Sequence, residues 1–487
     1  MTATPPSRPS TGYRADIDGL RAIAVLSVVL FHARVAPFSG GYVGVDIFFV
    51  ISGFLITRLI ADDIEQRRFS IVHFYERRIR RIFPALYLVV LICFIPALWL
   101  LMPLDLKRFG EAAAATTVFL SNVLFWHRSG YFGESATVQP LLHTWSLAVE
   151  EQFYVVYPLF LIVVMRLMRG HGRRLLLIAG LLVASLIASV VITRYWPSAG
   201  FYLPASRAWE LLLGAMLALR PPAPIHNRAM RELIAGGGLA AILAAIFLFS
   251  PETAFPGYAA LLPCLGAAAL IYAGTSGRSV ATSLLGAPAC RFVGLISYSF
   301  YLWHWPLIVF TQYWYDQRAP AWAVALAVLA SAGLGALSWR WIEHPFRQKQ
   351  TFPRRRIFML AAVVSAFVFI LGAGVSYLQG LPGRFDAATL TYAAGERTFH
   401  RITCTAWPPR HGAPVWTSCA AWELTRRRRP RLSCGATPMP KLCAAPFRMP
   451  PPRSDAPAFS RDVRAVRRCL RSPAPIRCWS ANRSAAP

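Results

Sequence analysis

An arginine and a histidine share one face of the first long apolar run of the chain. Arg21 and His32 lie eleven residues apart, which in an α-helix is three turns and a rise of about 16 Å. A cation near one end of the helix is thereby aligned with an imidazole near the other. Ionisable side chains within a membrane span are costly and mark functional sites by default. The spacing alone leaves open that Arg21 reaches toward the headgroups and that His32 lies at the membrane interface.

A second basic group precedes the third apolar run. The segment FYERRIRRIFP contains four arginines, among them Arg77, Arg78 and Arg81. Guanidinium groups are well suited to binding phosphate. We expect this segment to be a cytoplasmic loop beside a helix start, where it either binds phosphate or serves as an ordinary positive-inside anchor.

Polar side chains gather at the start of the fourth apolar run, HTWSLAVEEQFY. Ser146, Glu150 and Tyr154 recur at four-residue spacing and therefore share a face of a helix. Two adjacent glutamates are hard to place against lipid. Glu150 is therefore a candidate either to orient the imidazole of His32 or to bind sugar hydroxyls.

Other ionisable groups lie within later apolar runs. Arg207 and Glu210, at i and i+3, predict an ion pair inside the membrane, with a structural role favoured over a catalytic one. His304 lies between two tryptophans, where packing is at least as reasonable an interpretation as chemistry. The remaining candidates for substrate or structural support are Asp46, His143 and Trp145.

The composition places these residues in a membrane protein. The chain has 487 residues, of which 56% are hydrophobic and 15% charged, whereas a soluble domain carries about 25% charged residues. A formal net charge of +29 often indicates a nucleic-acid partner. Here the charges lie in short loops between apolar runs, so we interpret them as topology signals and expect no nucleic acid. No cysteine spacing resembles a zinc site, and we expect no metal.

Eleven apolar segments approach the length of about 20 residues that a span requires. With the N-terminus in the cytoplasm, the cytoplasmic segments hold 25 Lys and Arg and the external loops 6, as the positive-inside rule requires. A twelfth segment, Ala112–Trp126, is flanked by charge and predicts a re-entrant or interfacial piece. The eleven run approximately over Ile17–Ala33, Tyr42–Ile60, Ile82–Met102, Leu142–Met165, Leu175–Ile192, Ala208–Leu219, Leu233–Phe249, Gly257–Ala273, Phe292–Tyr313, Ala321–Trp339 and Ile357–Leu378.

The predicted fold is therefore an all-α polytopic protein of the bacterial inner membrane, with about ten core helices and one extra helix that leads to the periplasm. We expect a cytoplasmic N-terminus over 1–16, a transmembrane domain over 17–347, the extra helix over 357–378 and a periplasmic tail over 379–487. The tail holds 19 Lys and Arg, 5 Asp and Glu, and 15 prolines, a composition typical of disorder.

Seven motifs in order resemble the membrane acyltransferase-3 family, of the O-antigen acetylase type. The resemblance covers roughly Tyr13 to Phe385. It implies a cytoplasmic acyl-CoA donor, usually acetyl-CoA, no permanently bound cofactor, and a hydroxyl of a lipid-linked or surface glycan as acceptor, for example lipopolysaccharide O-antigen, exopolysaccharide or peptidoglycan. It also implies His32 as the catalytic residue and an acyl-CoA role for Arg21, Arg77, Arg78 and Arg81. The motifs are DGLRAIAVLSVVLFH, GVDIFFVISGFLIT, RRIRRIFP, HTWSLAVEEQFY, RAWELLLG, ISYSFYLWHWPL and WIEHPFR.

The segment Gly380–Phe385, which follows the last predicted span, resembles the same segment of family members that carry a periplasmic SGNH-type domain after their last helix. The Gly-Asp-Ser block and the later Asp-x-x-His of that domain do not follow Phe385. From about Ala394 the composition is typical of GC-rich codons read in a shifted frame, so we expect that domain to be lost or out of frame. The alternative is a genuine basic tail whose six cysteines form disulfides.

The residues leave more than one function open. In an enzyme, His32 takes the proton of the acceptor hydroxyl as that hydroxyl attacks the thioester, with or without an acyl-histidine intermediate. The alternative is a transporter that moves acyl groups, or an acylated lipid-linked glycan, without performing the transfer. The lack of an evident internal repeat counts against transport. A non-catalytic sensor is a third possibility.

Overall fold

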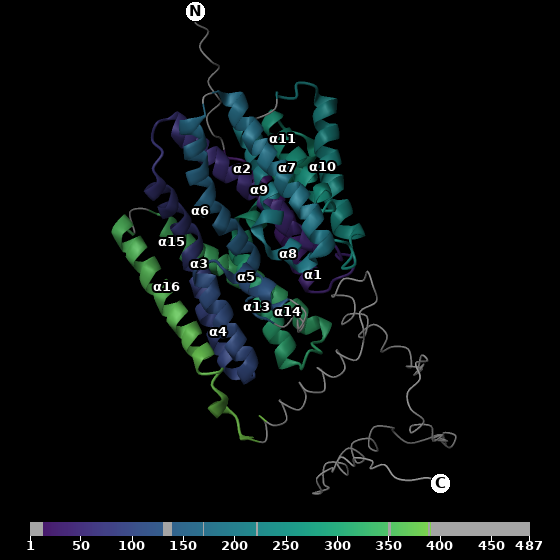
Figure 1. Ribbon diagram of the computed structural model, residues 1–487. Coiled ribbons are helices and arrows are strands. Elements are labelled where there is room, and N and C mark those ends of the chain that lie inside the picture. Colours follow the sequence, from purple (N-terminus) through teal and green to yellow (C-terminus); the bar gives the residue numbers. More distant parts are fainter. Residues whose placement is uncertain are drawn as a thin grey trace, which may run out of the picture. The chain divides into compact units, whose positions relative to one another are not determined.

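The computed structural model describes residues 13–129, 139–168, 170–220, 223–348, 352–387 and 390. All of them belong to the first of two compact units, which covers Met1–Arg427. The predictions for the first twelve residues and for the tail beyond Ala394 fall outside the described residues. Within those residues every regular element is a helix (Figure 1), so the predicted all-α membrane fold is confirmed.

Each of the eleven predicted segments corresponds to a helix. Among the described residues, eight helices are long and apolar enough to cross a membrane by length and composition. They are α2 (Gly44–Glu65), α3 (Ile71–Leu100), α6 (Thr144–Leu167), α7 (His171–Tyr195), α10 (Arg228–Leu248), α13 (Pro288–Trp314), α14 (Ala321–Ser338) continued by a π-helical turn (Trp339–Glu343) and α15 (His344–Arg347), and α16 (Arg354–Tyr377). The other three are α1 (Ala15–His32), which carries three charged residues, and the shorter α9 (Ala208–Leu219) and α11 (Leu261–Ser276).

Helix α3 begins well before the predicted span. Its first residue is Ile71, and not Ile82, so the prediction of a loop for the arginine-rich segment is wrong. Ser70 caps the helix by accepting the backbone N–H of His73, and such a cap satisfies a donor that the first turn leaves free. The pair Glu76 and Arg80, at i and i+4, then stabilises the early turns.

The segment Ala112–Trp126 is not one piece but parts of two short helices, α4 (Pro103–Thr117) and α5 (Ser121–Arg128). Phe119, between them, has a positive φ of 53°, a left-handed conformation that ends a helix. The helix α16 packs against both α4 and α3 (Figure 1). The extra helix is therefore part of the same packed unit as the core.

Close helix contacts hold α1 and α2, which carry several candidate residues. A Cβ at Gly53 of α2 would overlap the backbone of Leu211 in α9, and one at Gly214 of α9 would overlap the carbonyl of Val50. Helix α1 packs between α2 and α13. Small residues at such crossings let membrane helices approach closely. The same kind of contact joins α1 to α13, where a Cβ at Gly294 would overlap the carbonyl of Asp18.

Candidate functional site

Three histidines meet at the end of α1. Nδ1 of His32 lies 3.0 Å from Nε2 of His304 in α13, and the two rings stack with centroids 5.2 Å apart and planes 11° apart. His143, which immediately precedes α6, approaches the His304 ring edge-on, with centroids 5.9 Å apart. From the sequence, the role of His304 could be either packing or chemistry. In the structure it is the hydrogen-bond partner of His32.

Tyr301, which was not among the predicted site residues, connects these histidines. Its carbonyl lies 2.5 Å from Nδ1 of His304, and its hydroxyl donates to the carbonyl of His143 over 3.0 Å. The hydroxyl of Ser146 lies 2.8 Å from the same phenol. Tyr301 precedes His304 by one helical turn, and that spacing is the signal in the sequence that could have identified it.

The polar face of α6 extends away from the histidines. Ser146 contacts Tyr301, Glu150 accepts a hydrogen bond from Ser52 of α2 at 2.7 Å, and the Tyr154 ring lies 5.7 Å from the Arg78 guanidinium. Glu150 therefore has Ser52, and not His32, as its hydrogen-bond partner. The predicted shared face of α6 links the histidines to the arginines.

Positive charge gathers at the opposite end of α1. Arg81 of α3 interacts electrostatically with Arg21 of α1, Arg78 of α3 and Arg347 of α15. We call these four residues the arginine cluster. Arg347 was not among the predicted site residues, although its motif, WIEHPFR, was. Several guanidinium groups from three helices form a suitable site for a polyphosphate.

The arginines of α3 are not equivalent. Arg77 forms an ion pair with Asp63 at 2.7 Å, and Arg80 does so with Glu76 at 2.9 Å. The side chain of Arg81 forms no hydrogen bond with any residue that the structure describes, and only part of its surface is covered. Arg81 is therefore the arginine of this motif that is most available to a ligand, whereas Arg77 is already paired.

The predicted ion pair of Arg207 and Glu210 is confirmed, with Nη1 of Arg207 2.9 Å from Oε1 of Glu210. The same Nη1 lies 2.8 Å from Oδ1 of Asp46, and all three side chains are buried. Asp46, Glu210 and Cys264 lie close enough together to hold a metal ion, but the guanidinium already supplies a cation to both carboxylates. Four aromatic rings surround that guanidinium at 5.5–5.6 Å, those of Phe49, Trp145, Phe201 and Phe255. The structure therefore places Asp46 and Trp145 in this buried cluster.

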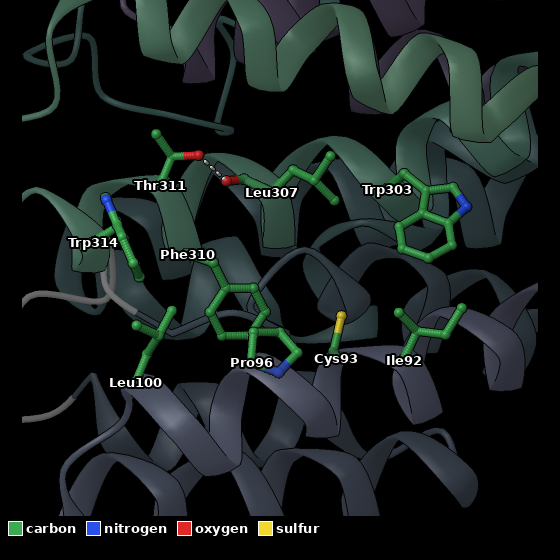
Figure 2. Close-up of a pocket in the computed structure, with 9 residues that line it drawn as sticks. All are labelled: Ile92, Cys93, Pro96, Leu100, Trp303, Leu307, Phe310, Thr311 and Trp314. Carbon is green, nitrogen blue, oxygen red and sulfur yellow. Dashed lines mark hydrogen bonds between the residues drawn. The ribbon is translucent and has the colours of Figure 1, made fainter.

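An apolar pocket of about 310 Å³ lies between α3 and α13. Figure 2 shows its lining, in which Trp303 stands next in sequence to His304. The hydroxyl of Thr311 donates its hydrogen to the carbonyl of Leu307 over 2.7 Å, so it can only accept a hydrogen bond from a ligand. No charged side chain lines the pocket, so its chemistry suits a hydrocarbon chain and not a sugar or a phosphate.

Comparison with known proteins shows the family to which the chain belongs. Residues 14–341 match the family model described as an acyltransferase domain. The chain belongs to the acyltransferase-3 family. The matched residues include the three histidines at one end of α1. They also include the arginine cluster at the other end, except Arg347.

Curated relatives of this acyltransferase-3 protein carry related names. It is 32% identical over 364 residues to the peptidoglycan O-acetyltransferase OatA of Listeria monocytogenes, covering 70% of this chain and 57% of the relative. It is 31% identical over 357 residues to the O-acetyltransferase OatA of Staphylococcus aureus, covering 70% and 58%. The alignments thus span less than two thirds of these relatives. No solved structure matches the chain.

Proposed function

We propose that the protein transfers an acetyl group from acetyl-CoA to a hydroxyl of a cell-envelope carbohydrate. The observation that carries this proposal is that one helix, α1, has Arg21 within the arginine cluster and His32 within the histidine group. The names of the relatives support acetyl as the acyl group and peptidoglycan as the first acceptor to test. Lipopolysaccharide O-antigen and exopolysaccharide are the next candidate acceptors to test.

The arginine cluster is the proposed binding site for the phosphates of the donor. Arg21, Arg81 and Arg347 come from three helices and bring their charges together, as recognition of several phosphates requires. The extended pantetheine arm then runs along α1, which rises about 16 Å over the three turns between Arg21 and His32. This path places the thioester near the imidazole of His32.

His32 is the proposed general base. Its imidazole takes the proton of the acceptor hydroxyl while the hydroxyl oxygen attacks the thioester carbonyl. The carbon–sulfur bond then breaks, and the imidazolium returns the proton to the departing sulfur. The products are the acetyl ester and the free thiol of CoA. No acyl-enzyme is required, although the arrangement is compatible with one.

The proposed orientation puts the arginine cluster at the cytoplasmic face of the inner membrane, where the donor is made. His32 then faces the periplasmic side and the acceptor. In this proposal residues 17–347 form the catalytic membrane domain and residues 357–378 the helix that leads outward. The tail from residue 379 stands where related chains carry an SGNH-type domain.

Radiolabel transfer tests the proposal. The purified full chain in lipid nanodiscs is incubated with acetyl-CoA labelled in the acetyl group and with either de-O-acetylated peptidoglycan fragments or de-O-acetylated lipopolysaccharide. We expect alkali-labile label on one glycan and an equal amount of free CoA thiol. Thiol release without label on either glycan would contradict the proposal. So would label carried into sealed vesicles that contain the protein, without thiol release.

A further inference from the structure

A relay of three polar groups leads from the backbone of α13 to the proposed base. The carbonyl oxygen of Tyr301 lies 2.5 Å from Nδ1 of His304. On the other side of the same ring, Nε2 of His304 lies 3.0 Å from Nδ1 of His32. His304 is therefore bonded at both ring nitrogens, whereas His32 is bonded at Nδ1 alone among the described residues.

The carbonyl determines where the proton of His304 lies. A carbonyl oxygen only accepts hydrogen bonds, so Nδ1 of His304 must carry hydrogen and donate to Tyr301. His304 is fully buried, and in the part of the chain that the structure describes no carboxylate bonds to it. Because charging such a ring is costly, His304 is the neutral imidazole. Its Nε2 is then an acceptor.

The tautomer of His32 follows from that of His304. Since Nε2 of His304 can only accept, Nδ1 of His32 must be the donor in the 3.0 Å hydrogen bond. A neutral His32 then has no hydrogen on Nε2, whose lone pair is free. The direction of the relay is thus set by one backbone carbonyl and does not depend on a carboxylate.

We propose that His304 is a positioning residue that holds His32 as the Nδ1–H tautomer and so presents Nε2 as the proton acceptor. This inference rests on the proposed function, because it assigns the base to His32. Positioning by a hydrogen bond to the second ring nitrogen is a general way to orient a histidine.

A purely structural role for His304 makes a different prediction. If His304 only fills space between two tryptophans, a side chain of similar size without a hydrogen-bond acceptor suffices. Two variants therefore separate the roles. His304→Gln supplies an amide oxygen that can accept from Nδ1–H of His32, and His304→Leu supplies a similar volume without an acceptor.

The test combines activity with nitrogen-15 NMR of histidine-labelled full-length protein in nanodiscs, with the His32 resonances identified by their loss in His32→Ala. We expect protonated Nδ1 and unprotonated Nε2 for His32 in wild type and in His304→Gln, and a mixture of tautomers in His304→Leu. We expect His304→Gln to keep kcat within about 10-fold of wild type and His304→Leu to lose on the order of 10²-fold or more, with KM for acetyl-CoA unchanged in both.

Several outcomes would overturn the inference. One is a wild-type His32 that is protonated at Nε2, and another is a His304→Leu variant that keeps both the tautomer and the rate. If His304→Leu does not fold, the wild-type spectrum and the His304→Gln variant alone show whether His304 sets the tautomer of His32. Failure of the proposed function is seen separately: the wild type then transfers no label to a glycan, or His32→Ala transfers as much as the wild type, whatever tautomer the spectrum shows.

Discussion

Nη1 of Arg207, just before α9, lies 2.8 Å from Oδ1 of Asp46 in α2, and both side chains are shielded from solvent. The same nitrogen donates to Glu210. One guanidinium thus joins two carboxylates within the packed helices. Removing one partner from a buried ion pair leaves an uncompensated charge, which is more costly than the pair itself is stabilising.

Arg207→Ala should therefore destabilise the protein strongly. Asp46 and Glu210 would lose the one cation that they contact among the described residues, at a cost of about 3–5 kcal/mol. The measurement is the thermal unfolding midpoint in detergent, with Arg228→Ala as the control because Arg228 is exposed. Equal midpoints for the two variants would show that the Arg207 cluster does not hold α2 against α9.

The crossing of α2 and α9 should tolerate no side chain at Gly53. A Cβ there would overlap the Leu211 backbone, so Gly53→Ala must push the helices apart, at a cost of about 1–3 kcal/mol. Gly333→Ala is the matched control, since a Cβ at Gly333 in α14 meets nothing within 4 Å. That control should be neutral or slightly stabilising, by up to about 1 kcal/mol. Unfolding midpoints for both variants check this, and a stable Gly53→Ala would be inconsistent with the close packing.

Arg81→Ala and Arg80→Ala should affect different properties. The side chain of Arg81 has no hydrogen bond to a described residue and lies in the arginine cluster, so its loss should raise KM for acetyl-CoA by about 10-fold or more with little change in stability. Arg80 is bonded to Glu76 and to the carbonyls of Phe346 and Phe352, so its loss should lower the unfolding midpoint. The same comparison with acetyl-pantetheine, which carries no phosphate, separates phosphate binding from other effects. A rise in KM for Arg81→Ala that is no smaller with acetyl-pantetheine would argue against phosphate recognition by this residue.

The proposed orientation predicts where added cysteines react. Gln66 is exposed between α2 and α3, and Gly383 is exposed after α16. In a variant without native cysteines, Gln66→Cys should react with an impermeant maleimide only from the cytoplasmic side, and Gly383→Cys only from outside. Labelling of Gln66→Cys in intact cells would reverse the orientation and place the arginine cluster on the wrong face for acetyl-CoA.

The sequence was sufficient for the helices but not for the contacts between them. Apolar length predicts all eleven segments, and the i, i+3 spacing predicts the pair of Arg207 and Glu210. The sequence predicts a loop for the polar start of α3 because the arginines there interrupt the helical repeat of apolar residues. Two of those arginines are paired, Arg77 with Asp63 of α2 and Arg80 with Glu76 one turn earlier in α3. Only the pairing with Asp63 needs the folded chain to bring two helices together.

The partner of His32 could not be deduced from spacing. His304 is 272 residues away in sequence, and a histidine between two tryptophans has no local pattern that separates packing from chemistry. Glu150 was a reasonable candidate because a carboxylate often orients a histidine, but the rotation of α6 turns it toward Ser52. The direction in which a helix face points, and the helices that it contacts, are set by packing, which a single sequence does not show.

Transfer of label by His32→Ala tests the central claim most directly. The assay is acetyl transfer from acetyl-CoA to the acceptor glycan by the purified full chain, with binding of CoA measured on the same sample. His226→Ala is the control, because His226 is exposed and lies outside the site. We predict that His32→Ala loses transfer by about 10²–10⁴-fold while it inserts, folds and binds CoA as the control does. Transfer by His32→Ala at a rate close to that of His226→Ala would contradict the assignment of His32 as the base.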